Sequence, residues 1–227
     1  MIRKILLSVL LCTNITFSHA QDYDQISKEI CKSITKDQSL SGKIKFPDFR
    51  DFIKTDADKF LISDVNVFQF NLQKSLIKNC TEFPFIENYS LVPFSNVVDL
   101  EKVFNREDLA KLEKQLKEIQ KTSRFQLFII STDDYFPNEN ITDYSFSILN
   151  NNSSDLFQKG NMIIVFNLKS REVRISTNKI AQNIISDEFS QKLIDEIIVP
   201  NFSEEKYFEG IKNSIGEISR QIGQNKL

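Results

Sequence analysis

The sequence is poor in the residues that break regular structure and in the side chain that most often performs catalysis. Among 227 residues there are five glycines, five prolines, three cysteines, one histidine and no tryptophan. So few glycines and prolines exclude a low-complexity linker or repeat protein. The twenty phenylalanines and the 41% apolar content instead predict a globular chain with a core built largely of Phe and Ile.

The first twenty residues have the layout of a cleavable secretory signal. Two basic residues precede a short apolar run, Ile5–Cys12, and a polar stretch closes on Ser18-His19-Ala20. We expect cleavage before Gln21 and an exported protein, periplasmic or secreted. The run is shorter than the roughly 20 residues of a membrane helix, which disfavours a permanent anchor. A lipoprotein anchored at Cys12 is disfavoured because Leu11, and not a small residue, precedes that cysteine.

Removal of the signal would change both the chemistry and the charge of the chain. His19 is the only histidine, so the mature protein would lack every mechanism that needs an imidazole, including Ser-His-Asp, Cys-His and the usual zinc hydrolase sites. Loss of Arg3 and Lys4 takes two of the 29 basic residues and none of the 31 acidic ones, so the net charge becomes about −4. This charge argues against a nucleic-acid partner. No later apolar stretch is long enough for a transmembrane segment.

Two cysteines, Cys31 and Cys80, would remain in the mature chain. A cysteine pair in an exported protein is most often a disulfide, with a metal pair or a catalytic thiol as the alternatives. Apolar residues four apart predict helices over 23–36 and 64–79, and a short helix is expected around 49–60. A Cys31–Cys80 bond would join these helices into a small helical module, residues 21–91, followed by a domain boundary in a segment bracketed by prolines.

The second unit, residues 92–227, alternates strands and helices. Val97-Val98-Asp99 opens it, and Asn105 caps a strongly amphipathic helix that continues to Thr122. Strands are predicted at Phe125–Ser131, Met162–Leu168 and, through a hairpin, Glu172–Ser176, and further helices at 141–149, 190–199 (ended by Pro200) and 204–222. Fold class is therefore α/β: an α/β/α sandwich with a short mixed sheet, preceded by the helical module.

Several short motifs along this unit are specific in combination. They are Phe104-Asn105-Arg106-Glu107-Asp108 after the first strand, Gly160 to Val165, Arg171 to Ile175, Ile185-Ser186-Asp187, Ile197 to Phe202, and Tyr207 to Ile211. In this order they resemble the TPM domain family, which is found in bacterial exported proteins, thylakoid lumen proteins and animal membrane proteins. The resemblance covers most of residues 92–227 and leaves residues 21–91 outside it.

The resemblance implies an α/β/α sandwich, divalent cation binding in some members, weak acid phosphatase activity in a plant branch, and otherwise interaction roles around membrane complexes. The chain departs from the family pattern at two places. Asn150 to Ser154 replace a glycine-rich stretch of which only Gly160 is kept, and Thr177 to Ala181 replace a glycine-rich turn that ends in an acid. Because such glycines let the backbone approach an ion or phosphate closely, their absence argues against a phosphatase and against a family-like metal site.

Acidic residues at strand ends are the candidate ligands. Asp99, Asp133 and Asp134 follow predicted strands, and Asp187 could approach them if the loop before its helix folds over the sheet. With water and Asn178, these oxygens could bind Ca²⁺ or another divalent cation. The structural alternative is that Asp99 ends a strand and that Asp187 serves the amino terminus of a helix.

The sequence therefore predicts an exported binding or accessory factor of the cell envelope, with an envelope protein as its partner and a divalent cation as a candidate ligand. The enzyme alternative is a weak metal-dependent acid phosphatase in which Asp99, Asp133 and Asp187 hold the metal or attack the phosphate. That alternative requires these carboxylates to converge in one cleft.

Overall fold

The computed structural model describes residues 23–25, 27–28, 31, 62–80, 93, 95–152 and 159–225. The predicted signal peptide, the short helix expected around 49–60 and much of the remaining helical module lie outside the described residues. The described part of the helix predicted over 23–36 is helical and includes Cys31.

Four strands form one mixed sheet in the order β1-β2-β3-β4. They are β1 Val97–Asp99, β2 Phe125–Ser131, β3 Gly160–Asn167 and β4 Glu172–Thr177. The first three run parallel and β4 runs antiparallel to β3. Each parallel pair needs a crossover connection, which helices provide, whereas β4 follows β3 through a tight turn. The mixed sheet predicted from the sequence is confirmed.

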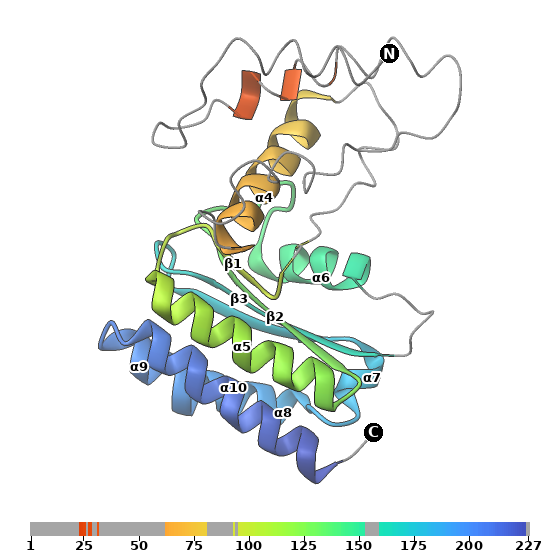
Figure 1. The fold of residues 1–227 in the computed structure, drawn as a ribbon, viewed down its shortest axis with the longest axis vertical. Coiled ribbons are helices and arrows are strands. Elements are labelled where there is room, and N and C mark those ends of the chain that lie inside the picture. Colours follow the sequence, from red (N-terminus) through yellow and green to blue (C-terminus); the bar gives the residue numbers. More distant parts are fainter. Residues whose placement is uncertain are drawn as a thin grey trace.

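Helices cover both faces of the sheet (Figure 1). The long ones are α4 Ile62–Asn79, α5 Arg106–Thr122, α6 Ile141–Asn152 and α10 Tyr207–Gln224. Between β4 and α10 lie α7 Lys179–Gln182, α8 Asp187–Leu193, a π-helical segment η4 Ile194–Ile198, and α9 Val199–Ser203. The chain is therefore an α/β/α sandwich, as the pattern of elements predicts.

Alternation along β3 divides the core into two layers. Ile164 belongs to a cluster with residues of α5 and α10, whereas Ile163 belongs to a cluster with residues of α6. Successive side chains of a strand point to opposite faces, so an uninterrupted apolar run fills both layers. All eight residues of β3 are buried, which is the pattern of a central strand covered on both sides.

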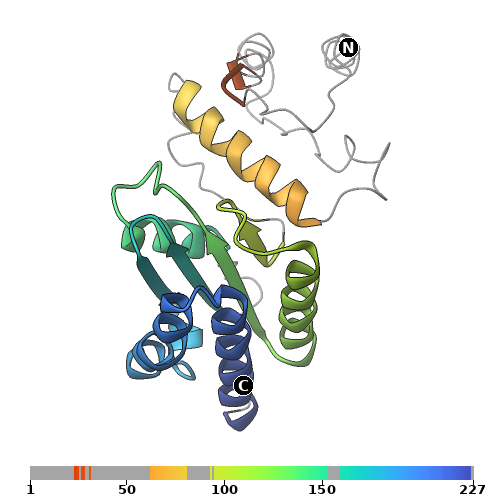
Figure 2. The same ribbon diagram turned by 90° about the vertical axis from the view of Figure 1, so that its left-hand side faces the viewer.

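The helix α4 packs against the sheet on the same face as α6 (Figures 1 and 2). Its Phe70 is 1% exposed and shares the second cluster with Val98 of β1 and Tyr144 of α6. Asn66 of α4 donates from Nδ2 to the carbonyl oxygen of Val97 at 2.8 Å and accepts from the backbone N–H of Ser95 at 3.0 Å. The predicted boundary at residue 91 thus separates two segments that share a core.

Cys31 and Cys80 form a disulfide with their Cα atoms 5.9 Å apart. The pairing predicted from the cysteine count is confirmed. The bond joins the amino-terminal helical segment to the residue that follows α4, and both cysteines are buried.

Asp24 makes a second contact between the amino-terminal segment and α4. Its carboxylate accepts hydrogen bonds from Ser75 Oγ at 2.8 Å, Lys78 Nζ at 3.1 Å and Asn79 Nδ2 at 3.1 Å. These bonds, that from Ser75 first, lower the pKa of Asp24 to about 2. The segment is therefore attached to the carboxyl end of α4 by polar side chains as well as by the disulfide.

The helix α5 follows the sequence prediction closely. Asn105 is its N-cap, and its Oδ1 accepts from the backbone N–H of Asp108 at 2.9 Å. The helix ends at Thr122, and its buried stripe contains Leu109, Leu112, Leu116 and Ile119.

The prediction that Pro200 ends a helix is wrong. The helix begins at Asp187, with Ser186 as its N-cap, and continues through η4 into α9, which ends at Ser203. Pro200 lies in the first turn of α9, where the missing N–H of a proline costs least. The preceding π-helical segment shifts the hydrogen-bond pattern just before the proline, so the chain accommodates the ring without stopping. Across the described residues, no helix is both long and apolar enough to cross a membrane.

Candidate functional site

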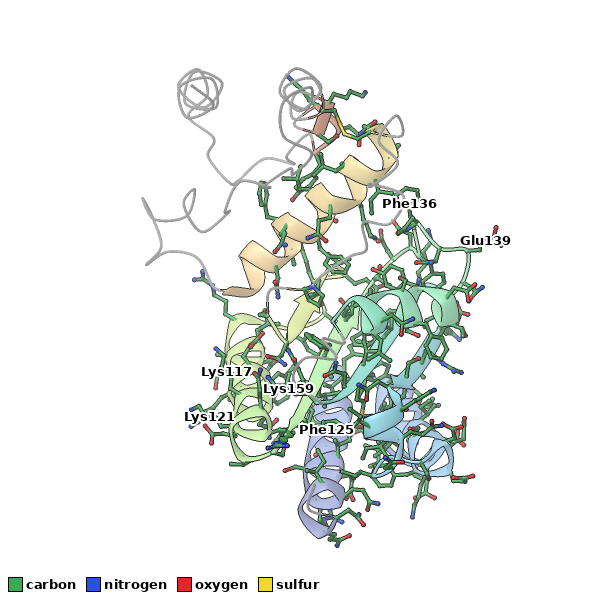
Figure 3. The ribbon with its side chains drawn as sticks, turned by 90° about the vertical axis from the view of Figure 1, so that its right-hand side faces the viewer. Lys117, Lys121, Phe125, Phe136, Glu139 and Lys159 are labelled. Carbon is green, nitrogen blue, oxygen red and sulfur yellow. A yellow bond between two sulfur atoms is a disulfide. The ribbon has the colours of Figure 1, made fainter. Side chains whose placement is uncertain are left out.

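The carboxyl ends of β1, β2 and β3 lie side by side. The register places Asp99 beside Ser131 and Ser131 beside Phe166, so the loops that leave these strands share one edge of the sheet, called here the carboxyl edge. Such edges are where open α/β sheets tend to bind ligands. Figure 3 shows Phe136 and Glu139 in the loop between β2 and α6 at this edge, and Phe125 and Lys159 at the opposite, amino edge.

Asp99 has a buried carboxylate that protein donors occupy. It is 3% exposed, and its Oδ1 accepts from Ser131 Oγ at 2.6 Å and from the backbone N–H of Val103 at 3.0 Å. Its Oδ2 accepts from the backbone N–H of Phe104 at 2.9 Å. A carboxylate offers about four acceptor positions, so three of them are in use. Asp99 therefore fixes the turn that leads from β1 into α5.

Glu101 is a carboxylate at the carboxyl edge that sequence reasoning missed. Both of its side-chain oxygens accept from the backbone N–H of Leu168, at 3.2 and 3.1 Å. Burial, followed by the nearby charges of Asp133 and Asp99, raises the pKa of Glu101, while the backbone donors of Leu168 and Lys169 act in the opposite direction. The sequence contains a signal for it, because Glu101 lies two residues after the end of β1, in the loop that leaves the carboxyl edge.

Asp134 is paired with a lysine from outside the parallel strands. Lys74 of α4 donates to Asp134 Oδ1 at 2.7 Å, and the same ammonium lies 5.9 Å from the centre of the Tyr144 ring. The Lys74 side chain is 11% exposed and that of Asp134 54% exposed, so the lysine contributes the more buried half of the pair. The backbone N–H of Phe136 also donates to Asp134 Oδ1, at 3.0 Å. The acid thus organises its own loop and binds α4.

Asp187 lies at the amino edge and does not join the other acids. The antiparallel β4 returns the chain to that end, where Asn178 Nδ2 donates to the carbonyl oxygen of Lys159 at 2.9 Å. The helix α7 follows at once, and Gln182 Nε2 donates to Asp187 Oδ1 at 3.5 Å. The four predicted ligands are therefore split, with Asp99, Asp133 and Asp134 at one edge and Asp187 at the other.

Asn178 acts as a structural amide rather than as a neighbour of the acids. Its Oδ1 accepts from the backbone N–H groups of Asn161 at 3.0 Å and Ala181 at 2.9 Å, which caps α7. Gly160 nearby has a packing role, because a Cβ at that position would come within 2.8 Å of the Phe125 ring. The glycine is therefore explained by the close approach of this ring.

The residues at the carboxyl edge offer few free metal ligands. Within residues 62–80, 95–152 and 159–225, no group of three or more His, Cys, Asp and Glu side chains is arranged to hold a metal ion. A hard cation takes six to eight oxygen ligands, and Asp99 and Asp134 already accept hydrogen bonds from the protein. Glu101 also accepts from the protein with both oxygens, so Asp133 is the carboxylate at this edge with most capacity left to bind a cation together with water.

The chain is similar at low sequence identity to solved structures of other proteins. One is the solution structure of the N-terminal domain of a protein from P. gingivalis, 16% identical, which covers 57% of this chain and 82% of that one with a TM-score of 0.46. A second is BA42 from the psychrophilic bacterium Bizionia argentinensis, 13% identical, covering 55% of this chain and 85% of that one with a TM-score of 0.47.

A third is the N-terminal domain of the cg2496 protein from Corynebacterium glutamicum, 10% identical, covering 59% of this chain and 81% of that one with a TM-score of 0.43. No curated protein matches the chain. The family model of the TPM domain matches residues 97–221, which is more than half of the 227 residues. With its four-stranded mixed sheet between two helical layers, this chain belongs to the TPM domain family.

Proposed function

We propose that this protein is an exported binding or accessory factor of the cell envelope, and that its TPM domain works by contacting a protein partner rather than by turning over a substrate. The hydrogen bonding of the Asp99 carboxylate is the observation that supports this proposal. Its carboxylate is buried and accepts from Ser131, Val103 and Phe104, so it has little capacity left for a metal or a phosphate.

The other acids at the carboxyl edge support the same conclusion. A nucleophilic or metal-binding carboxylate needs a free oxygen that faces the substrate. Asp134 is bonded to Lys74 and to its own loop. Asp187, the third member of the phosphatase alternative, lies near Gln182 at the other edge. Because Asp187 lies at the opposite edge from Asp99 and Asp133, the three acids of that alternative are not brought together, which favours the binding role.

Weak binding of a divalent cation remains part of the proposal. Glu101 has a raised pKa in part because Asp133 and Asp99 are close to it. A cation bound by Asp133 beside Glu101 would relieve this repulsion, since opposite charge favours the ionised form of a carboxyl group. The cation would reduce the charge repulsion at the carboxyl edge and would take no part in a reaction.

Export is supported by the disulfide and by the family. Disulfides persist in oxidising compartments, and Cys31–Cys80 joins the segment beyond the predicted signal to α4. We expect the expressed full chain to be recovered outside the cytoplasm with Gln21 as its first residue. Intact-mass measurement of the recovered protein tests this, and an uncleaved chain retained in the cytoplasm would contradict it.

One titration separates the binding role from the enzymatic one. The chain from residue 21 onward is mixed with Ca²⁺ in a calorimeter and with p-nitrophenyl phosphate in a parallel assay, beside the variants Asp133→Asn and Lys159→Gln. We expect weak heat that Asp133→Asn reduces and Lys159→Gln does not, and no hydrolysis above the buffer rate. Hydrolysis that Asp133→Asn abolishes would overturn the proposal.

A further inference from the structure

The two edge strands of the sheet differ in what occupies their outward backbone groups. At β1, the N–H of Val97 donates to Glu113 Oε1 at 3.0 Å. The carbonyl oxygen of Val97 accepts from Asn66 Nδ2 at 2.8 Å and from Ser95 Oγ at 3.0 Å. Side chains from α5 and α4 therefore close this edge, which is one way in which proteins prevent unwanted strand pairing.

Among the residues that the structure describes, none closes the edge at β4 in this way. Alternate residues of an antiparallel strand bond to the neighbouring strand, and the residues between them face outward. The N–H of Asn178 donates to the carbonyl oxygen of Asn161 at 2.9 Å, which fixes the alternation. The pairs bonded to β3 are then Asn161–Asn178, Ile163–Ser176, Val165–Arg174 and Asn167–Glu172.

The backbone groups of Val173, Ile175 and Thr177 consequently point away from the sheet. No described residue closes them as Glu113 and Asn66 close β1. We call these three residues, together with Arg174, the β4 edge. A row of open N–H and C=O groups is a template for one more strand.

Arg174 places a cation at this edge for which the described residues provide no anionic partner. Its guanidinium lies 5.8 Å from the centre of the Phe146 ring of α6, and its Nε is buried without a hydrogen-bond acceptor. Glu172, two residues away, accepts instead from the Tyr135 hydroxyl at 2.6 Å. Phe146 is 39% exposed, so a ligand can reach part of the aromatic ring beside the guanidinium. A buried donor without an acceptor favours a ligand that supplies one.

We propose that the β4 edge binds an extended segment of a partner protein that carries an acidic residue, so that the segment adds a fifth strand to the sheet. The backbone of the segment pairs with Val173, Ile175 and Thr177, and its carboxylate binds Arg174. The proposal rests on the binding role proposed above only for the statement that the ligand is a protein.

Strand geometry specifies the sequence pattern of the ligand. Arg174 faces the α6 side, whereas Ile175 and Val173 face the layer of α5 and α10. Directly opposed residues of paired strands point to the same face. The segment therefore needs an acidic residue opposite Arg174, between apolar β-branched residues opposite Val173 and Ile175. Backbone bonds would give the affinity, and the charge pair the selectivity.

The test uses the chain from residue 21 onward and a blocked peptide, Thr-Val-Thr-Val-Glu-Val-Thr, followed by amide NMR. We expect saturable binding with a dissociation constant of about 1 mM or tighter, and slower hydrogen exchange at the amides of Val173, Ile175 and Thr177. A peptide with Gln in place of Glu should bind about tenfold more weakly, because it loses a charge-assisted hydrogen bond. A peptide N-methylated on its pairing edge should not bind.

Matched variants separate the edge from general charge attraction. Arg174→Gln should reproduce the tenfold loss with the Glu peptide, and Lys169→Gln, an equal charge change in the adjacent turn, should not. Val173→Pro removes an outward N–H that the fold does not use, so it should weaken both peptides with little change in the melting temperature.

Three results would overturn the proposal. The first is no binding at millimolar peptide, and the second is equal losses in Arg174→Gln and Lys169→Gln. The third is a dimer of the free protein in sedimentation with the β4 amides already protected, which would make a second copy of the chain the occupant. The binding role proposed above would survive the first two results, because its own test is the titration at the carboxyl edge.

Discussion

The two ends of the sheet use the same arrangement of hydrogen bonds with different charge. At the carboxyl edge the carboxylate of Asp99 accepts from the N–H groups of Val103 and Phe104, and at the amino edge the amide oxygen of Asn178 accepts from those of Asn161 and Ala181. Asp99 is the last residue of β1 and Asn178 directly follows β4, and each fixes the next turn. An acid at a strand end is therefore no signature of a ligand site by itself, because a neutral amide performs the same task in this chain.

The two edges also differ in the charged residues that surround Asp99 and Asn178. Asn178 can also donate, and its Nδ2 bonds to the carbonyl oxygen of Lys159. The carboxyl edge instead collects four acids, and Lys74 reaches in from α4 to bind one of them. The amino edge forms its turn without a counter-ion, whereas the carboxyl edge recruits a helix that lies outside residues 97–221.

The largest expected effect comes from removing the buried carboxylate. Asp99→Ala should lower the free energy of unfolding by about 2–4 kcal/mol, because three donors, two of them in buried hydrogen bonds, lose their acceptor. Urea denaturation measures the loss. The control Asp133→Ala, on an exposed side chain, should stay within about 0.5 kcal/mol. A loss below 1 kcal/mol for Asp99→Ala would mean that water replaces the carboxylate and that the turn is not held as we describe.

The matched change at the amino edge should cost less. Asn178→Ala should lower the free energy of unfolding by about 1–2 kcal/mol, since an N-cap bond and two further side-chain hydrogen bonds are lost. Thermal and urea unfolding measure it beside Asp187→Asn, whose side chain has one long contact and should have little effect. If Asn178→Ala proved costlier than Asp99→Ala, the comparison between the two ends would be reversed.

Replacing the lysine that reaches the carboxyl edge should have a smaller effect. Lys74→Met removes a pair with a half-exposed acid and a contact with the Tyr144 ring, worth about 1 kcal/mol together. The loss should shrink in 0.5 M NaCl, because salt screens the ionic part. Lys117→Met on α5 serves as the control. An unchanged loss in high salt would assign the effect to packing of the lysine stem.

The smallest effect concerns the pH dependence that Glu101 contributes. Its raised pKa means that the folded state disfavours the ionised form, so the stability that this group contributes is present below its ordinary pKa and is lost as the pH rises through the folded value. The wild type should therefore lose stability relative to Glu101→Gln as the pH rises above 4.5, the ordinary pKa of the group. Urea midpoints at several pH values measure this. A difference independent of pH would contradict the raised pKa.

Local patterns in the sequence predicted those parts of the fold that depend on local chemistry. Asn105 was recognised as a cap because a side-chain oxygen three residues ahead of an N–H is sufficient to make that bond. The strands β2 and β3 were found because buried parallel strands are continuously apolar. The helix end predicted at Pro200 was wrong, since the π-helical segment that accommodates the proline has no local signal of its own.

The candidate site was less predictable, because it depends on contacts between distant segments. The position of Asp187 depends on the direction of β4. Because β4 is antiparallel to β3, it returns the chain to the amino edge, away from the loops that follow β1 and β2. Lys74 is 60 residues from Asp134, and no spacing rule connects them. The availability of Asp99 depends on the turn at 100–104, whose N–H groups point back at the carboxylate only in the folded chain.

The disulfide also has a mechanical consequence. A force applied to the amino terminus passes through Cys31 to Cys80, so the 48 residues between them carry no load and cannot be extended. A pulled oxidised molecule should come out shorter than a reduced one by about 170 Å of contour length. The covalent bond would bring such a load directly to the residue after α4 and, through the helix, to the sheet on which it packs.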